Sequence, residues 1–284
     1  MRLTFLGTSA ANAYPEAFCS CSNCRRARAE GGRSLRVRSS ALVNSDLLID
    51  LGPDIMAAAQ RHGIDLTGVH YCLQTHPHAD HMDLSHLLSR SPGFGVVGAP
   101  RLHFYASPAT LERADQTFRR DLWGHGLTDP GASKELNLAL HPIPALQPVQ
   151  VGPYRVTAYP ANHAPGLGAY LYAIEHEGHS LFYGIDTAAL TEDTWRAFHQ
   201  HRVHLDLVVL DHTYGPAEEG SDHLSAGQLI EHARRMRAEG LLKEGARVFG
   251  THIAHEGNPP HAELAAFASQ HGYEVAYDGL VVTI

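Results

Sequence analysis

The residues best suited to chemistry lie in one short segment, residues 73–81, which reads L-Q-T-H-P-H-A-D-H. Three histidines and one aspartate fall within six positions, and imidazole and carboxylate are ligands that first-row divalent metals prefer. His76 and His78 are two residues apart, so both can point the same way from an extended loop. Asp80 and His81 follow directly and would face a second point in space. The segment therefore predicts one loop that serves two metal ions.

A histidine-rich surface loop is the alternative interpretation, because the chain contains 22 histidines. The flanking sequence favours the metal site. Residues 69–73 are typical of a buried strand, and residues 82–89 of the start of a helix. Ligands at the carboxyl end of a strand are common in α/β proteins, since the rigid sheet holds the loop in place.

A second group of candidate ligands is the motif C-x-C-x2-C formed by Cys19, Cys21 and Cys24. Three thiols this close together can converge on one zinc ion, which takes four nitrogen or sulfur ligands in a structural site. A fourth ligand must then come from elsewhere in the chain. Free surface thiols or one disulfide are the alternatives. Cys72 lies alone in an apolar strand and is interpreted as a core residue.

Other polar residues follow predicted strands further along the chain. His163 comes just after a strand at 149–158, Asp186 ends a hairpin of residues 169–175 and 180–185, and His252 follows a strand at 247–251. A lone aspartate at a strand end is more often a turn or N-cap residue. The small-residue loop at 7–12 is either an ordinary turn or part of the site.

The elements that must position these residues form two series of strands with helices between and after them. This order predicts a four-layer αββα sandwich, with two mixed sheets face to face and helices outside. No polar linker divides the chain, so residues 1–284 are expected to form a single domain. Residues 221–222 are predicted to cap a long helix that would run to about residue 239.

Composition limits the classes of partner. The 284 residues are 44% hydrophobic and 18% charged, and no apolar run approaches the ~20 residues that span a bilayer. The first residues lack a signal-peptide core, which favours a cytoplasmic protein without membrane contact. A net charge of −8 makes a nucleic-acid partner unfavourable, whereas bound metals would still attract a small phosphorylated substrate.

The motif T-H-x-H-x-D-H at residues 75–81 resembles the signature of the metallo-β-lactamase superfamily. The resemblance implies the sandwich fold and a binuclear centre in which a hydroxide bound to the metals is the nucleophile. It also implies that Asp50, at the end of a strand, supports a ligand histidine. Asp80 is assigned to catalysis as well as to metal binding. The implied ligands are His76, His78 and His163 for one metal, Asp80, His81 and His252 for the other, and Asp186 between them.

The cysteine motif narrows the resemblance to the phosphodiesterase family that hydrolyses phosphoribosyl 1,2-cyclic phosphate, the PhnP family. In that family a histidine three residues after the last catalytic ligand closes a structural zinc site, which here implies His255. A histidine before the last long helix acts as a general acid or phosphate contact, which implies His223. The resemblance implies a phosphodiesterase that uses two divalent metals, with Zn, Mn and Fe all compatible, one structural Zn, and a homodimer.

Two other functions remain as alternatives. A nuclease of the tRNA 3′-end type uses similar ligands but needs a basic surface, which the net charge disfavours. A PqqB-like protein of cofactor biosynthesis shares the cysteine motif but lacks the full histidine motif. The chain is also longer than expected for the PhnP family, and residues 94–148 are the predicted source of the difference and are expected to shape the substrate pocket.

Overall fold

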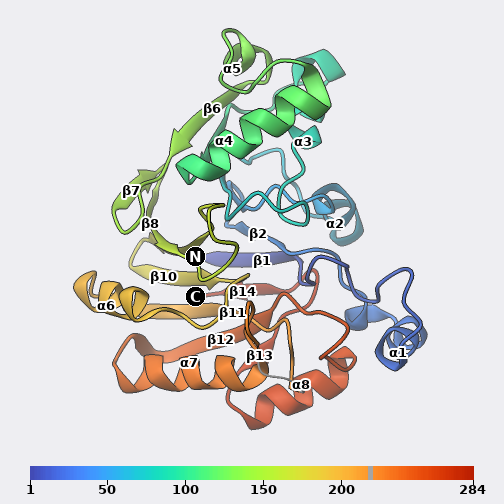
Figure 1. Ribbon diagram of the computed structural model, residues 1–284, viewed down its shortest axis with the longest axis vertical. Helices are drawn as coiled ribbons and strands as arrows, with labels where there is room; N and C mark the ends of the chain where they lie inside the picture. Colours follow the sequence, from blue (N-terminus) through green and yellow to red (C-terminus); the bar gives the residue numbers. More distant parts are fainter. Residues whose placement is uncertain (217–219) are drawn as a thin grey trace.

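The computed structural model describes residues 1–216 and 220–284, and their strands form two seven-stranded sheets that face each other (Figure 1). The first sheet has the order β14-β1-β2-β3-β4-β5-β6. The strands of this sheet are β1 (Arg2–Gly7), β2 (Ser40–Val43), β3 (Leu47–Ile49), β4 (Tyr71–Leu73), β5 (Leu102–Ala106), β6 (Leu138–Pro142) and β14 (Val281–Thr283).

The second sheet has the order β13-β12-β11-β10-β9-β8-β7. Its strands are β7 (Pro148–Val151), β8 (Tyr154–Pro160), β9 (Tyr170–His176), β10 (His179–Gly184), β11 (Leu205–Asp211), β12 (Leu242–Thr251) and β13 (Glu274–Val275). Both sheets are mixed: β3 to β6 pair in parallel in the first, and β10 to β13 in the second. The carboxyl ends of several strands therefore meet at one edge of the sandwich.

The helices form the outer layers. They are α1 (Ser22–Glu30), α2 (Ile55–His62), α3 (Ser85–Ser89), α4 (Pro108–Thr117), α5 (Ala132–Glu135), α6 (Glu192–Gln200), α7 (Ala226–Ala238) and α8 (His261–Gln270), with single turns η1 (Gly32–Ser34), η2 (Pro92–Phe94) and η3 (Phe118–Trp123). Helices α2 to α4 cover the outer face of the first sheet, and α6 to α8 cover that of the second (Figure 1).

Three buried clusters hold these layers together. The central cluster, with Phe5, Tyr172 and Phe249, lies between the two sheets. The other two lie between each sheet and its helices and include Phe104 and Phe198 respectively. Burying a large side chain of this kind contributes about 1.5–3 kcal/mol. The predicted αββα sandwich is confirmed.

Two local predictions were wrong. Helix α7 begins after Ser225 and not after residues 221–222: the Ser225 hydroxyl accepts a hydrogen bond from the backbone N–H of Gln228, whose side chain bonds back to the Ser225 N–H. This reciprocal capping box satisfies two helix-terminal donors, which a lone Asp222 cannot do. The strand before the histidine loop is also shorter than predicted, with only Tyr71–Leu73 paired.

Three strand ends share an unusual backbone conformation. Asp50, Asp186 and His252 have positive φ angles of 65°, 57° and 60°, a region that residues with a Cβ atom rarely adopt. Each of them turns the chain sharply at the end of β3, β10 or β12. Such strain clusters at functional sites, and here it aims three polar side chains at the same edge of the sandwich.

Among residues 1–216 and 220–284, no helix has the length and apolar character needed to cross a bilayer.

Candidate metal centre

Four side chains from three separate segments meet at the edge where the strands end. His76 and His78 follow β4, His163 follows β8, and Asp186 follows β10. His76 Nε2 lies 2.9 Å from His78 Nδ1 and 3.1 Å from Asp186 Oδ2. His163 Nε2 lies 3.2 Å from His78 Nδ1 and 3.3 Å from Asp186 Oδ1. We call these four residues cluster A.

Cluster B consists of Asp80, His81, His252 and the same Asp186. His81 Nε2 lies 2.9 Å from Asp186 Oδ2 and 3.2 Å from Asp80 Oδ2. His252 Nε2 lies 3.4 Å from His81 Nε2 and 3.7 Å from each of the two carboxylates. Asp186 thus faces both clusters, as the sequence resemblance implied.

The spacing of these atoms fits divalent cations. A tetrahedral zinc ion with bonds of about 2.0–2.1 Å holds neighbouring nitrogen or oxygen ligands about 3.3 Å apart. Asp186 Oδ1 is fully buried without a hydrogen-bond partner, although His163 Nε2 and His223 Nδ1 lie 3.3 and 3.2 Å away. A buried carboxylate oxygen without a partner is costly, and a metal ion would satisfy it.

The electrostatics of cluster B also favour a cation. Burial lowers the pKa of His81, but the carboxylates of Asp80 and Asp50 raise it well above its usual value. The pKa of Asp186 is held well below its usual range, since the effect of burial is outweighed by His252, His76 and His81. Positive charge is therefore stabilised between these carboxylates, where a divalent ion would supply it.

Asp50 positions His81 from behind. It is fully buried, and its Oδ2 accepts a hydrogen bond from His81 Nδ1 at 2.7 Å. Its Oδ1 accepts bonds from the Thr75 N–H at 2.7 Å and from Gln74 Nε2 at 3.0 Å. These bonds fix the imidazole so that Nε2 faces cluster B. The structure thus contains the contact with a candidate ligand histidine that was expected of Asp50.

Asp211, the last residue of β11, also contacts the site, although it was not among the residues predicted from the sequence. Its Oδ2 accepts hydrogen bonds from the Asp186 N–H at 2.9 Å and from His223 Nδ1 at 3.0 Å. Its Oδ1 accepts from the Thr213 N–H at 2.9 Å, and the Thr213 hydroxyl contacts His252 Nδ1 at 2.8 Å. The signal was available, because Asp211 is an acidic residue at the end of a buried strand, like Asp50 and Asp186.

His223 lies beside both clusters: its Nδ1 is 3.2 Å from Asp186 Oδ1, and with Asp186, Asp211 and His252 it forms a further group of side chains that could hold a metal ion. Its ring centroid is 5.0 Å from that of His163 and 5.4 Å from that of His252. Burial lowers its pKa, but the hydrogen bond to Asp211 and the negative charges of Asp211 and Asp186 raise it to about 9. Its side chain is 15% exposed. The structure thus places a largely buried imidazole, hydrogen-bonded to Asp211, next to the candidate metal ligands.

A cavity of about 530 Å³ opens onto the clusters. Ligands from both clusters line it together with His223, and residues 10–12 of the small-residue loop at 7–12, followed by Ala13, form part of its wall. Of the two interpretations for that loop, the structure favours a role in the site. The remaining wall comes from the segments around Tyr214, Asp222 and Glu256.

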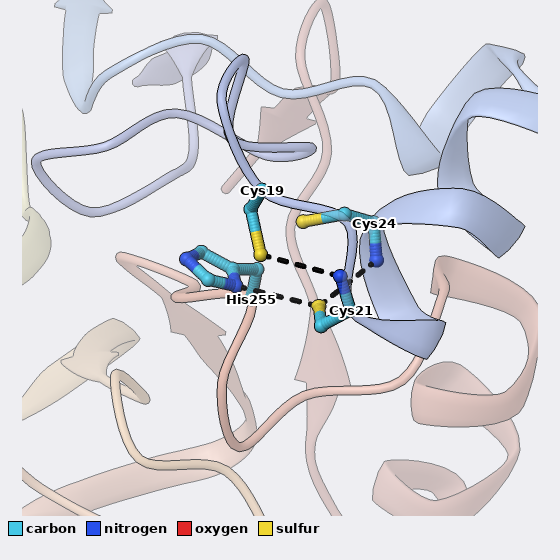
Figure 2. Close-up of side chains that lie close together, drawn as sticks. All are labelled: Cys19, Cys21, Cys24 and His255. Carbon is cyan, nitrogen blue, oxygen red and sulfur yellow. Dashed lines mark hydrogen bonds between the residues drawn. The ribbon is translucent and has the colours of Figure 1, made fainter.

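The cysteine motif and His255 also converge, as Figure 2 shows. The ligand atoms of all four residues lie within 4.8 Å of one another, and Cys21 Sγ is 3.7 Å from His255 Nδ1. Zinc bonds of about 2.3 Å to sulfur and 2.0 Å to nitrogen give a similar spacing. Burial raises the pKa of Cys21, but the Cys24 N–H at the start of α1 and His255 lower it to about 6, which favours the thiolate that binds metal.

The expectation for residues 94–148 was wrong. None of them lies among the described residues that line the cavity. The segment instead contributes β5 and β6 to the first sheet and packs α4 against it, and it supports the loop that follows His163. The Thr110 hydroxyl donates to the Leu167 carbonyl at 3.2 Å, and Gly168 lies so close to Ser107 that a Cβ atom would be 2.5 Å from its hydroxyl. Its effect on the site is therefore indirect.

Comparison with known proteins agrees with this fold. The family model for the beta-lactamase superfamily domain matches residues 46–253, and the chain belongs to this family. A sequence search of curated proteins returned no match.

Solved structures extend the comparison. A diphosphatase from the PhnP family superposes with a TM-score of 0.74 at 21% identity, over 100% of this chain and 97% of that chain. Zn²⁺-bound PqqB from Methylobacterium extorquens superposes with a TM-score of 0.69 at 22% identity, over 100% of this chain and 100% of that chain. The short form of human tRNase Z superposes with a TM-score of 0.66 at 16% identity, over 100% of this chain and 99% of that chain. At these identities the likeness shows the fold that the three proteins share with this chain.

Proposed function

We propose that this protein is a binuclear metal-dependent hydrolase of phosphoric esters, most specifically a phosphodiesterase that acts on a small substrate. The observation that carries the proposal is the shared Asp186, which joins two clusters of metal-ligating atoms at the floor of one cavity. Two divalent ions, Zn or Mn with Fe also compatible, would provide a Lewis acid and lower the pKa of a water molecule.

The chain's own residues would orient the reacting groups. Asp50 holds the imidazole of His81 and Thr213 holds that of His252, so little reorganisation is needed during the reaction. Asp80 completes cluster B and is only 11% exposed. His223 donates its Nδ1–H to Asp211, which leaves Nε2 as the nitrogen available to donate a proton to the leaving oxygen.

The choice of a phosphoryl centre is supported by three features together. Cys19, Cys21, Cys24 and His255 converge as they would in the PhnP family, the PhnP-family diphosphatase aligns over the whole chain, and His223 lies beside both clusters. We include one structural Zn at the cysteine cluster in the proposal. We also propose that the protein works in the cytoplasm and that it forms the homodimer that the resemblance implied.

The tRNA 3′-end nuclease is a weaker candidate. Its fold matches, but the described lining of the cavity contains no lysine or arginine, and such a side chain would be needed to grip a polyanion. The PqqB-like alternative also matches in fold, yet here all seven ligand residues of the two clusters are present and converge.

The proposal is tested by metal content together with hydrolysis of bis(p-nitrophenyl) phosphate. We expect about three metals per chain and turnover that a chelator abolishes and added Zn²⁺ or Mn²⁺ restores. One zinc per chain and no hydrolysis after metal addition would overturn the proposal and favour the cofactor-biosynthesis alternative.

A further inference from the structure

The cavity wall outside the two clusters carries negative charge. Among its described residues are two carboxylates, Asp222 and Glu256, but no lysine or arginine. The other wall residues outside the clusters are His223, Thr213, the aromatic Tyr214 and small residues, mainly those at 10–13. Whatever extends from the reacting phosphoryl group toward this wall therefore meets two anions and an aromatic ring.

The carboxylate of Asp222 is held in place and stays ionised. Its Oδ1 accepts hydrogen bonds from the Tyr214 hydroxyl and, at 3.3 Å, from the Ser221 hydroxyl. The bond from Tyr214 lowers the pKa of Asp222 below its usual value. Tyr214 is in turn placed against the site, with its ring centroid 6.0 Å from that of His223.

Glu256 brings the second negative charge. Its side chain is 64% exposed, and its Oε1 lies 3.2 Å from His255 Nε2. Because His255 presents Nδ1 to the cysteines, the cysteine cluster fixes the segment that carries Glu256 at the cavity wall. The charge is therefore a positioned part of the wall.

We propose that the site selects substrates by the charge of the group that the phosphoryl centre carries: cationic alcohols first, neutral alcohols next, and groups with a second phosphate last. The inference rests on the proposed function and narrows its substrate class. A distal phosphate would face Asp222 and Glu256 with no lysine or arginine beside them among the described wall residues, and the charge of His223 is already paired with Asp211, whereas an alkylammonium group would be attracted by both carboxylates and by the ring of Tyr214.

Two matched substrate pairs test the charge rule on the metal-loaded protein. The first pair is p-nitrophenyl phosphocholine and its carbon isostere, the 3,3-dimethylbutyl ester, which have the same shape but differ by one positive charge. The second is thymidine 5′-(p-nitrophenyl phosphate) with and without a 3′-phosphate. We expect kcat/KM to be about 3- to 10-fold higher for the choline ester than for its isostere at low salt. We expect it to be lower by a similar factor for the nucleotide with the 3′-phosphate than for the nucleotide without it. Both preferences, each expressed as the kcat/KM of the better substrate divided by that of the poorer one, should become smaller in high salt.

Charge-neutral variants identify the residues responsible. Asp222→Asn and Glu256→Gln should each weaken both preferences by about 2- to 5-fold. Each amide keeps the hydrogen-bond acceptor while it removes the charge. Glu177→Gln is the matched control, because Glu177 lies in the β9–β10 turn outside this cavity and is 82% exposed. Ratios that stay unchanged in Asp222→Asn and Glu256→Gln would overturn the assignment.

Binding separates the failure of this inference from the failure of the proposed function. Calorimetric titration of the metal-loaded protein with phosphocholine and with 3,3-dimethylbutyl phosphate compares their affinities without turnover. Tighter binding of phosphocholine in the absence of any hydrolysis would support the charge rule and refute the phosphodiesterase. Hydrolysis that is faster for the 3′-phosphorylated nucleotide would support the phosphodiesterase and refute the charge rule.

Discussion

His252 and His255 lie three residues apart after β12, and each presents a nitrogen to a different cluster. His252 Nε2 faces cluster B, whereas His255 Nδ1 faces the cysteines, 3.7 Å from Cys21 Sγ. Asn23, on α1, adds a hydrogen bond of 2.9 Å to the His255 carbonyl. The segment that carries a candidate catalytic ligand is therefore tethered to the cysteine cluster at its other end.

This tether predicts that Cys19→Ser removes one zinc per chain and lowers the free energy of unfolding by about 3 kcal/mol, because a structural metal contributes directly to folding. Elemental analysis and thermal unfolding measure the two effects. Cys72→Ala is the control: its thiol is fully buried in the core outside the cluster, so zinc content should stay constant. Unchanged zinc in Cys19→Ser would refute a zinc site here.

The contact between Asp50 and His81 predicts weaker metal binding in Asp50→Asn. The substitution removes the negative charge that orients and polarises His81, and such supporting partners typically change metal affinity by about 10- to 100-fold. Chelator competition measures the affinity. Asp54→Asn makes the same chemical change four residues later, in a side chain that pairs with Arg38, and should leave metal affinity unaltered.

The contacts of Asp211 predict that its substitution lowers turnover. The positions of the candidate ligands in the sequence do not by themselves indicate this effect. In Asp211→Asn the carboxylate that holds His223 and the Asp186 backbone loses its charge, so kcat should fall about 10- to 100-fold. Asp206→Asn is the matched control on the same strand, where the carboxylate pairs with Lys243 away from the clusters. Equal activity of the two variants would show that Asp211 has no positioning role.

His223→Ala should separate catalysis from metal binding. A proton donor contributes about 10²- to 10⁴-fold to a rate, so turnover of a phosphodiester with a poor leaving group should fall steeply while metal content is retained. The loss should be smaller with a p-nitrophenolate leaving group, which needs no proton. His199→Ala, at a half-exposed position on α6, serves as the control. Full activity with both kinds of substrate would refute the role.

Acid stability is predicted to depend on His212. Burial lowers its pKa to about 4, and its two nitrogens bond to Asn258 Oδ1 and the Tyr273 hydroxyl at 3.0 and 2.7 Å. Since the unfolded value is about 6.5, this contribution to stability is complete above pH 6.5 and is lost as the pH falls toward 4, by about 2 kcal/mol at pH 5. In urea unfolding, the free energy of unfolding should fall between pH 7 and pH 5 by about 2 kcal/mol less in His212→Gln than in the unsubstituted protein. An equal fall in the two proteins would contradict the prediction.

The sequence by itself determined the ligand-bearing loop and the fold class. The ligand-bearing loop is a local pattern behind a strand, formed by His76, His78, Asp80 and His81. A pattern of neighbouring residues can be recognised without knowledge of the tertiary structure. The same holds for Cys19, Cys21 and Cys24. The alternation of strands and helices was sufficient to predict the layered sandwich, because each apolar face must be buried against another element.

Only the tertiary structure decided what surrounds those ligands. Asp211 gained its role because β11 lies beside β10 and β12 and ends at the same edge of the sheet. Residues 94–148 lost their predicted role at the pocket because they form two strands and a covering helix of the first sheet, behind the His163 loop. The negative wall at Asp222 and Glu256 likewise depends on two loops that are distant in sequence. Contacts of this kind are set by strand order and loop packing, which no local pattern of residues encodes.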